Sequence, residues 1–123
     1  MSRLLSMFSL LLILSCKQLP QGPAKPLVDE HSRIMNKIEN DVTMPSGAGR
    51  VRDYERLYAW HFESGSSHAI SVIATYQLGA KNERHWINEL DMPVILDGGC
   101  SLVSLTFDRE TEKIISISCH GEA

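Results

Sequence analysis

The sequence lacks a hydrophobic run long enough to cross a membrane as a helix. Its longest apolar stretch, residues 4–14, is interrupted only by serines and covers eleven positions, whereas a membrane-spanning helix needs about 20. A basic patch is missing as well, because 12 Lys and Arg stand against 15 Asp and Glu, and no run of like charge occurs. Phosphate binding requires clustered basic side chains, so this composition argues against a nucleic-acid partner.

Catalytic signatures are also absent from the sequence. It contains no nucleophile elbow, no glycine loop that would cradle phosphate and no dinucleotide fingerprint. The five histidines are scattered and show no metal-ligand spacing. We therefore predict neither cofactor nor metal, and a non-enzymatic protein is favoured over an enzyme. The length of 123 residues leaves room for one domain.

Residues 1–15 have the composition of an export signal. Arg3 supplies a positive charge ahead of the apolar core at residues 4–14. This order of a charge, a short apolar core and then small residues is typical of a removable export signal. We predict that the signal is cleaved and that it does not anchor the chain.

The end of this core resembles the lipobox of bacterial lipoproteins, on the residues Ile13-Leu14-Ser15-Cys16. In that family the cysteine is lipidated and becomes the mature N-terminus, so the resemblance implies lipidation at Cys16. Lys17 in the next position implies the outer membrane, with the protein anchored in the bacterial cell envelope and facing the periplasm. The order Ile13-Leu14 departs from the commonest lipobox, which leaves a periplasmic or secreted domain without lipid as the alternative.

Residues 16–26 separate this cysteine from the rest of the chain. Pro20, Pro23 and Pro26 lie close together with Gly22 between them, which excludes a helix and an inner strand. We predict a partly extended tether that holds a single domain, residues 27–123, away from the membrane.

The first predicted element of the domain is an amphipathic helix over residues 27–42. Apolar and weakly polar side chains recur there at spacings of three and four, namely Val28, His31, Ile34, Met35, Ile38 and Val42. The narrow stripe predicts a helix that lies on a sheet. His31 on this stripe is expected to be an edge residue and not a ligand.

Two strands are predicted next, over residues 54–63 and 69–78. The first alternates with period two and places Tyr54, Arg56, Tyr58, Trp60 and Phe62 on one face. Cross-strand pairing favours a register with Trp60 opposite Ile70, Tyr58 opposite Val72 and Tyr54 opposite Tyr76. The aromatic stripe is expected to be core. Arg56 within it, and Trp86 in a short strand or edge at residues 85–87, are candidate binding residues.

The last predicted element is a hairpin of residues 100–107 and 113–119, which would bring Cys100 near Cys119. Cysteines in an exported domain are usually paired, so we predict a disulfide. Three registers remain open, one of which is a different loop that shifts the pairing by two residues and leaves the cysteines diagonal on one face. A four-residue loop sets Cys100 opposite Cys119, whereas a one-residue bulge sets Val103, Leu105 and Phe107 opposite Ile117, Ile115 and Lys113 and separates the cysteines.

These patterns together predict an α+β domain with one N-terminal amphipathic helix packed on an antiparallel sheet of four to five strands built from hairpins. The expected shape is similar to cystatin-like and other small helix-on-sheet domains. The function expected is a non-enzymatic binding or accessory module that contacts another envelope protein through an uncovered sheet face or the Trp86 loop. The alternative is a small hydrolase or metal-dependent enzyme that would need Asp97, His85 and His120 to converge.

Overall fold

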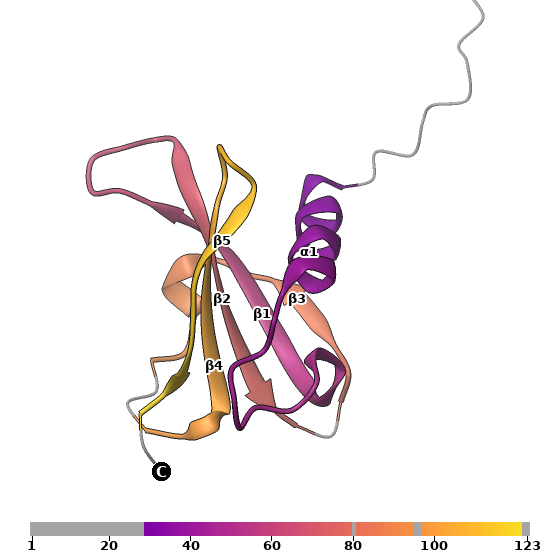
Figure 1. Cartoon of the computed structure of the whole chain (residues 1–123). Coiled ribbons are helices and arrows are strands. Elements are labelled where there is room, and N and C mark those ends of the chain that lie inside the picture. Colours follow the sequence, from indigo (N-terminus) through magenta and orange to yellow (C-terminus); the bar gives the residue numbers. More distant parts are fainter. Residues whose placement is uncertain (1–28, 80, 95–96, 122–123) are drawn as a thin grey trace, which may run out of the picture.

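The helix α1 (Glu30–Asp41) lies across one face of a twisted sheet (Figure 1). The computed structural model describes residues 29–79, 81–94 and 97–121, so the predicted signal, Cys16 and the tether lie outside the described residues. Asp29 caps α1 by accepting a hydrogen bond from the His31 amide. In the described part of the chain, no helix is long and apolar enough to cross a membrane.

The sheet has five strands in the order β3-β1-β2-β4-β5. Their bounds are Tyr54–Phe62 for β1, Ala69–Leu78 for β2, Arg84–Trp86 for β3, Gly99–Asp108 for β4 and Lys113–His120 for β5. Two short 3-10 helices, η1 (Val51–Asp53) and η2 (Glu89–Asp91), lie in the connections. The α+β class, the helix and the two long hairpins are confirmed.

The prediction of an antiparallel sheet is wrong for one strand, because β3 runs parallel to β1. Strand β2 ends opposite Tyr54, the first residue of β1, and β3 begins beside Arg56 on the other side of β1 as an edge strand. A strand of three residues carries too little alternation to reveal its direction in the sequence. The sheet is therefore mixed.

The predicted register of β1 and β2 is also wrong, by two residues. Trp60 lies opposite Val72 and Tyr58 opposite Ala74. Side chains alternate between the faces of a strand, so a two-residue shift keeps every predicted face. A register shift between His61 and Phe62, near the turn, accounts for one residue of this offset, which pairing energies alone could not reveal.

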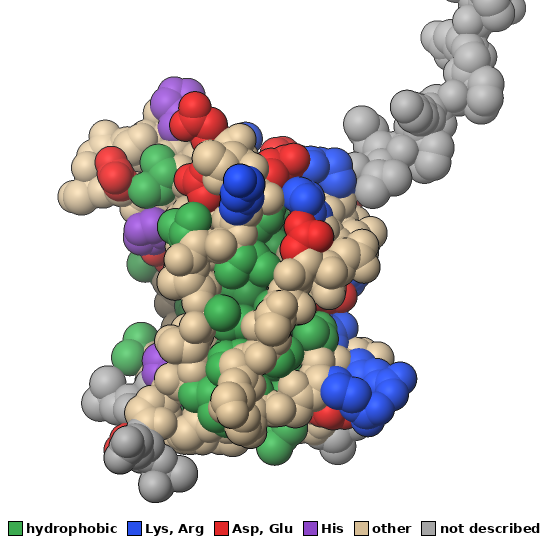
Figure 2. Space-filling model, viewed as in Figure 1, with side chains coloured by type: hydrophobic (Ala, Val, Ile, Leu, Met, Phe, Trp, Pro, Cys, Tyr) green, Lys and Arg blue, Asp and Glu red, His purple; other side chains and the backbone are tan. Residues whose placement is uncertain are grey.

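The hydrophobic core lies between α1 and the face of the sheet that α1 covers. Its buried members come from the helix and from β1, β2 and β4: Ile34, Met35, Ile38, Tyr54, Tyr58, Val72, Ala74, Tyr76, Val103, Leu105 and Phe107. Figure 2 shows hydrophobic side chains that reach the surface between α1 and β5. The prediction that the aromatic stripe is core holds for Tyr54 and Tyr58, which are fully buried.

Strand β4 begins with a bulge that none of the predicted registers contained. Gly99 lies opposite His120, but the next pair is Val103 opposite Cys119, so residues 100–102 have no partner on β5. These additional residues let the chain bend away from the ladder. The bend places the first cysteine beside the second without moving the apolar residues of β4 off the core face.

Strand β5 carries a second bulge near the hairpin turn. Thr106 pairs with Ser116 and Phe107 with Ile114, which leaves Ile115 as the additional residue. Ile115 is 62% exposed, as expected for a bulged residue that leaves the core face. The two bulges explain why the sequence left the register open. A register without them could either bring the cysteines together or place the most apolar residues on one face, but not both.

Candidate functional site

Trp86, a predicted binding residue, belongs to a half-buried aromatic cluster that joins α1 to the sheet. The His31 ring stacks on Trp86 with 4.0 Å between centroids, and Trp60 meets Trp86 edge-on at 5.1 Å. Trp60 Nε1–H donates to His31 Nε2 over 3.2 Å, so His31 Nδ1 carries the ring proton in neutral histidine. The structure thus places His31 at the edge of the core as a packing residue.

The loop after Trp86 forms a hollow with the end of β1. The hollow has a volume of about 570 Å³ and is lined by Trp60, Phe62, Ile87, Asn88, Glu89 and Leu90. Phe62 is 42% exposed and Leu90 is 92% exposed. Volumes of this order and predominantly apolar walls are typical of ligand and side-chain binding sites.

Glu89 is the charged residue in the lining of this hollow. Glu89 is hydrogen-bonded to His61 of β1, and its second oxygen accepts the amide of Phe62. The hydrogen bond with His61 holds the pKa of Glu89 below its ordinary value, so the carboxylate is charged at neutral pH. The hollow therefore combines an exposed apolar rim with one fixed negative charge.

Arg56, the other predicted binding residue, does not lie on the surface. It is 6% exposed, and its Nε donates to Glu39 Oε1 over 3.0 Å. Its Nη1 donates to the carbonyl oxygens of Val51 and Tyr54 and to Asn82 Oδ1. The prediction that Arg56 belongs to a binding surface is wrong, because a carboxylate from α1 pairs with it inside the domain.

Glu39 is the centre of a polar network under α1. Tyr58 O–H donates to Glu39 Oε1 over 2.8 Å. Because this uses the single proton of the Tyr58 hydroxyl, Tyr76 O–H is the donor in the 2.8 Å bond between the two phenols. Arg84 of β3 lies 3.3 Å from Glu39 Oε2. Burial raises the pKa of Tyr76 to about 12 and that of Tyr58 further, so both phenols keep their protons. This network is structural, because its polar groups face one another in the interior.

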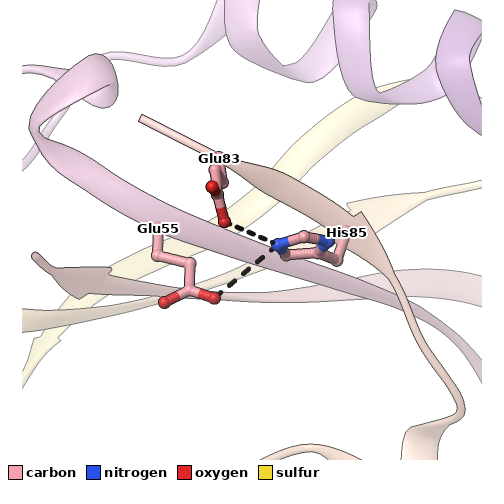
Figure 3. A group of neighbouring side chains, drawn as sticks. All are labelled: Glu55, Glu83 and His85. Atoms are coloured by element: carbon pink, nitrogen blue, oxygen red, sulfur yellow. Dashed lines mark ion pairs between the residues drawn. The ribbon is translucent and has the colours of Figure 1, made fainter. Parts of the chain in front are cut away.

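His85 lies on the face of β3 that is turned away from α1, beside two carboxylates (Figure 3). Its Nε2 is 3.4 Å from Glu83 Oε2 and 3.7 Å from Glu55 Oε1. Parallel pairing of β1 with β3 brings these three residues together, and the Arg56 amide fixes Glu83 by donating to its carbonyl. The sequence spacing gave no sign of this group.

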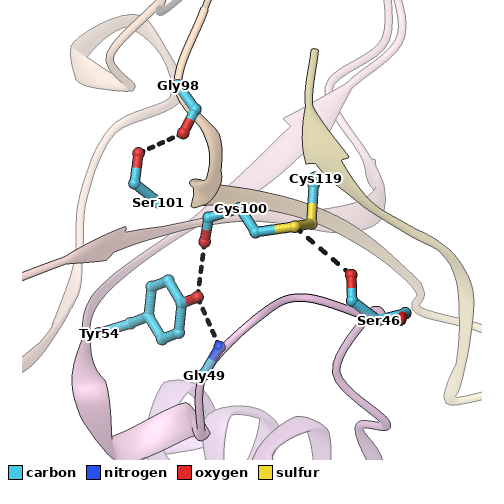
Figure 4. Close-up of a disulfide and its surroundings, with 7 residues drawn as sticks. All are labelled: Ser46, Gly49, Tyr54, Gly98, Cys100, Ser101 and Cys119. Carbon is cyan, nitrogen blue, oxygen red and sulfur yellow. Dashed lines mark hydrogen bonds between the residues drawn. A yellow bond between two sulfur atoms is a disulfide. The ribbon is translucent and has the colours of Figure 1, made fainter. Parts of the chain in front are cut away.

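Cys100 and Cys119 are joined by a disulfide (Figure 4), as predicted. Cys100 Sγ also lies 3.6 Å from the Ser46 carbonyl oxygen. Tyr54 O–H donates to the Cys100 carbonyl over 2.6 Å and accepts the Gly49 amide over 3.0 Å. The bond therefore sits against the loop that connects α1 to β1. Both thiols are used in the bond, which removes them as nucleophiles and as metal ligands.

The residues of the enzyme alternative do not converge. His85 lies on edge strand β3 and His120 on the opposite edge strand β5, with three strands between them. His120 contacts Ser104 of β4, while Asp97 is exposed ahead of β4. A general acid and base must lie within hydrogen-bond reach of a common substrate atom, and these two histidines do not.

Comparisons with protein-family models, with curated proteins and with solved structures find no match. Sequence reasoning found the cysteine pair and pointed to the loop beside the hollow. It missed Glu39 as the partner of Arg56, and it missed the Glu55, Glu83 and His85 group. Both depend on pairing between separate elements, for which a single sequence carries no local signal.

Proposed function

We propose that this protein is a lipid-anchored binding module of the bacterial cell envelope, attached through Cys16 and exported across the inner membrane. The Cys100–Cys119 disulfide supports export, since such bonds persist mainly in oxidising compartments. The charge ahead of the apolar residues 4–14 supports export. The lipobox-like Ile13-Leu14-Ser15-Cys16 supports attachment of a lipid at Cys16. Several acyl chains hold a protein firmly, whereas one chain binds only marginally.

The hollow beside the Trp86 loop is the observation that carries the binding part of the proposal. Phe62 and Leu90 expose large apolar surfaces on its rim, and Trp60 forms its wall. Buried aromatic and aliphatic anchors dominate the binding energy of protein interfaces. We assign the occupant as an apolar side chain of another envelope protein, with a positive or hydrogen-bonding group placed to meet Glu89.

The anchor is tested by labelling cells with a fatty-acid analogue. Wild-type protein is expected to take up label and to fractionate with membranes, whereas Cys16→Ser should lose both properties. Equal labelling of Cys16→Ser would contradict lipidation. A soluble, unlabelled wild-type protein without its signal would instead support the secreted alternative.

The binding surface is tested with a photo-reactive amino acid placed at Leu90 in intact cells. Ile115 is a matched control, because it is apolar and 62% exposed but lies on β5. A discrete cross-linked product is expected from position 90 and not from position 115. Phe62→Ser should remove the product, whereas Leu78→Ser, another exposed apolar site, should leave it. Identical products from both positions would refute the hollow as the docking site.

A further inference from the structure

The second site on this domain lies at its β3 edge and is independent of the proposed binding function. Glu55, Glu83 and His85 each offer one ligand atom, with all three atoms within 4.8 Å of one another. Both carboxylates face the same nitrogen of the His85 ring (Figure 3). The three side chains are partly exposed, so a cation and its water ligands can reach them.

The distances in this group do not describe an ordinary hydrogen-bonded ion pair. His85 Nε2 is 3.4 Å and 3.7 Å from the two carboxylate oxygens, beyond the roughly 3.2 Å limit of a normal N–H···O bond. Tetrahedral zinc, with bonds near 2.0–2.1 Å, separates neighbouring ligand atoms by about 3.3 Å. The imidazole nitrogen thus lies near this spacing from each of the two carboxylate oxygens, as a neighbouring ligand of one cation would.

The two histidines that lie beside glutamates in this molecule differ in their contacts. His61 and Glu89 form a close hydrogen bond with one carboxylate. His85, by contrast, stands between two carboxylates and is hydrogen-bonded to neither in the described part of the chain. The nearby arginines are not available, since Arg56 and Arg84 are both engaged with Glu39 on the other side of the sheet.

We propose that Glu55, Glu83 and His85 bind a zinc ion at the β3 edge, with water completing its coordination. One imidazole nitrogen and carboxylate oxygens are a ligand set that zinc accepts, and three protein ligands leave an open position. The paired strands hold Glu55 and His85 on one rigid surface.

The test is calorimetric titration of zinc chloride into the full-length, untagged and chelator-treated protein. One saturable site with a micromolar dissociation constant is expected, and both His85→Ala and Glu55→Gln should weaken it at least tenfold. The matched control His61→Ala, which removes the other histidine of a Glu pair, should leave the affinity unchanged.

Circular dichroism of each variant separates loss of the site from loss of the fold, and these partly exposed positions should leave the spectrum unaltered. The proposal is overturned if wild type shows no saturable binding, or if His61→Ala and His85→Ala weaken zinc binding equally. Cobalt absorption bands of tetrahedral type in wild type, lost in His85→Ala, would provide a second and independent readout. Failure of this site would leave the cross-linking result at Leu90 untouched.

Discussion

At the β3 edge of the sheet, Arg84 is tied to α1 through Glu39, whereas at the β5 edge Cys119 is tied covalently to β4. The first edge depends on charges that meet beneath a helix. The second depends on a bond that only a reductant breaks. A small domain buries a limited core, and here each edge strand has its own additional connection. The two edges should therefore respond to different perturbations.

Removal of Glu39 is expected to have the largest effect on stability. Glu39→Ala leaves the guanidinium of Arg56, which is 6% exposed, without its counter-ion, and breaking such a buried pair costs about 4 kcal/mol. Urea unfolding would measure this change. Glu39→Gln, which keeps an acceptor for Tyr58, should lose less.

The control for this prediction is Asp41→Ala on the same helix. Asp41 pairs with Lys37 on the exposed side of α1, where an ion pair contributes little. Equal shifts of the urea midpoint in Asp41→Ala and Glu39→Ala would mean that the Glu39 network beneath α1 does not stabilise the β3 edge.

Removal of the disulfide should have the next largest effect. The bond spans a sequence separation of 19 residues, and the loop-entropy relation gives about 3 kcal/mol for a loop of this size. The double variant Cys100→Ala/Cys119→Ala should unfold at correspondingly lower urea. Wild type in reductant should match the double variant, and the stability of the variant should not respond to reductant. A reductant-insensitive wild type would mean that the bond does not stabilise the β5 edge.

The smallest predicted effect concerns acid and the turn between β4 and β5. Hydrogen bonds from the Thr111 hydroxyl and amide hold the pKa of Asp108 below its ordinary value of 3.8. A folded pKa below the unfolded one adds stability that is present above pH 3.8 and is lost as the pH falls through the folded pKa. Asp108→Asn should therefore be less acid-sensitive than wild type when urea midpoints at pH 7 and pH 3 are compared.

Glu110→Gln removes a charge from the same turn without touching the bonds to Thr111, and it serves as the control. Its acid sensitivity should resemble that of wild type. If Glu110→Gln were as insensitive to acid as Asp108→Asn, the acid sensitivity of wild type would come from the net charge of the turn and not from the hydrogen bonds of Asp108.

The elements that sequence reasoning found are those with a local period. The spacing of Ile34, Met35 and Ile38 revealed the helix, and the alternation through Tyr54 and Tyr58 revealed the buried face of β1. A two-residue error in register did not disturb that face. The cysteine pair was predictable because the hairpin is local and the context of the chain indicated export.

The elements that it missed depend on contacts between distant segments. Arg56 was an unexplained charge within a stripe expected to be core, because its partner Glu39 comes from α1, a separate element. The direction of β3 and the grouping around His85 both follow from the parallel pairing of β3 with β1. A strand of three residues is too short for its hydrophobic pattern to reveal that pairing. The bulge at the start of β4 was likewise not predicted. A one-residue bulge near the turn was among the predicted registers, but with other pairs than those observed.

The contact between the disulfide and the loop that precedes β1 has a consequence for hydrogen exchange. The Gly49 amide is held by the Tyr54 hydroxyl, which in turn bonds to the carbonyl of Cys100. Opening of the bulge at Cys100 would therefore release the Gly49 amide, which lies 51 residues away in the sequence. We therefore expect reduction of the disulfide to speed hydrogen exchange at the Gly49 amide, as in segments that open as one cooperative unit.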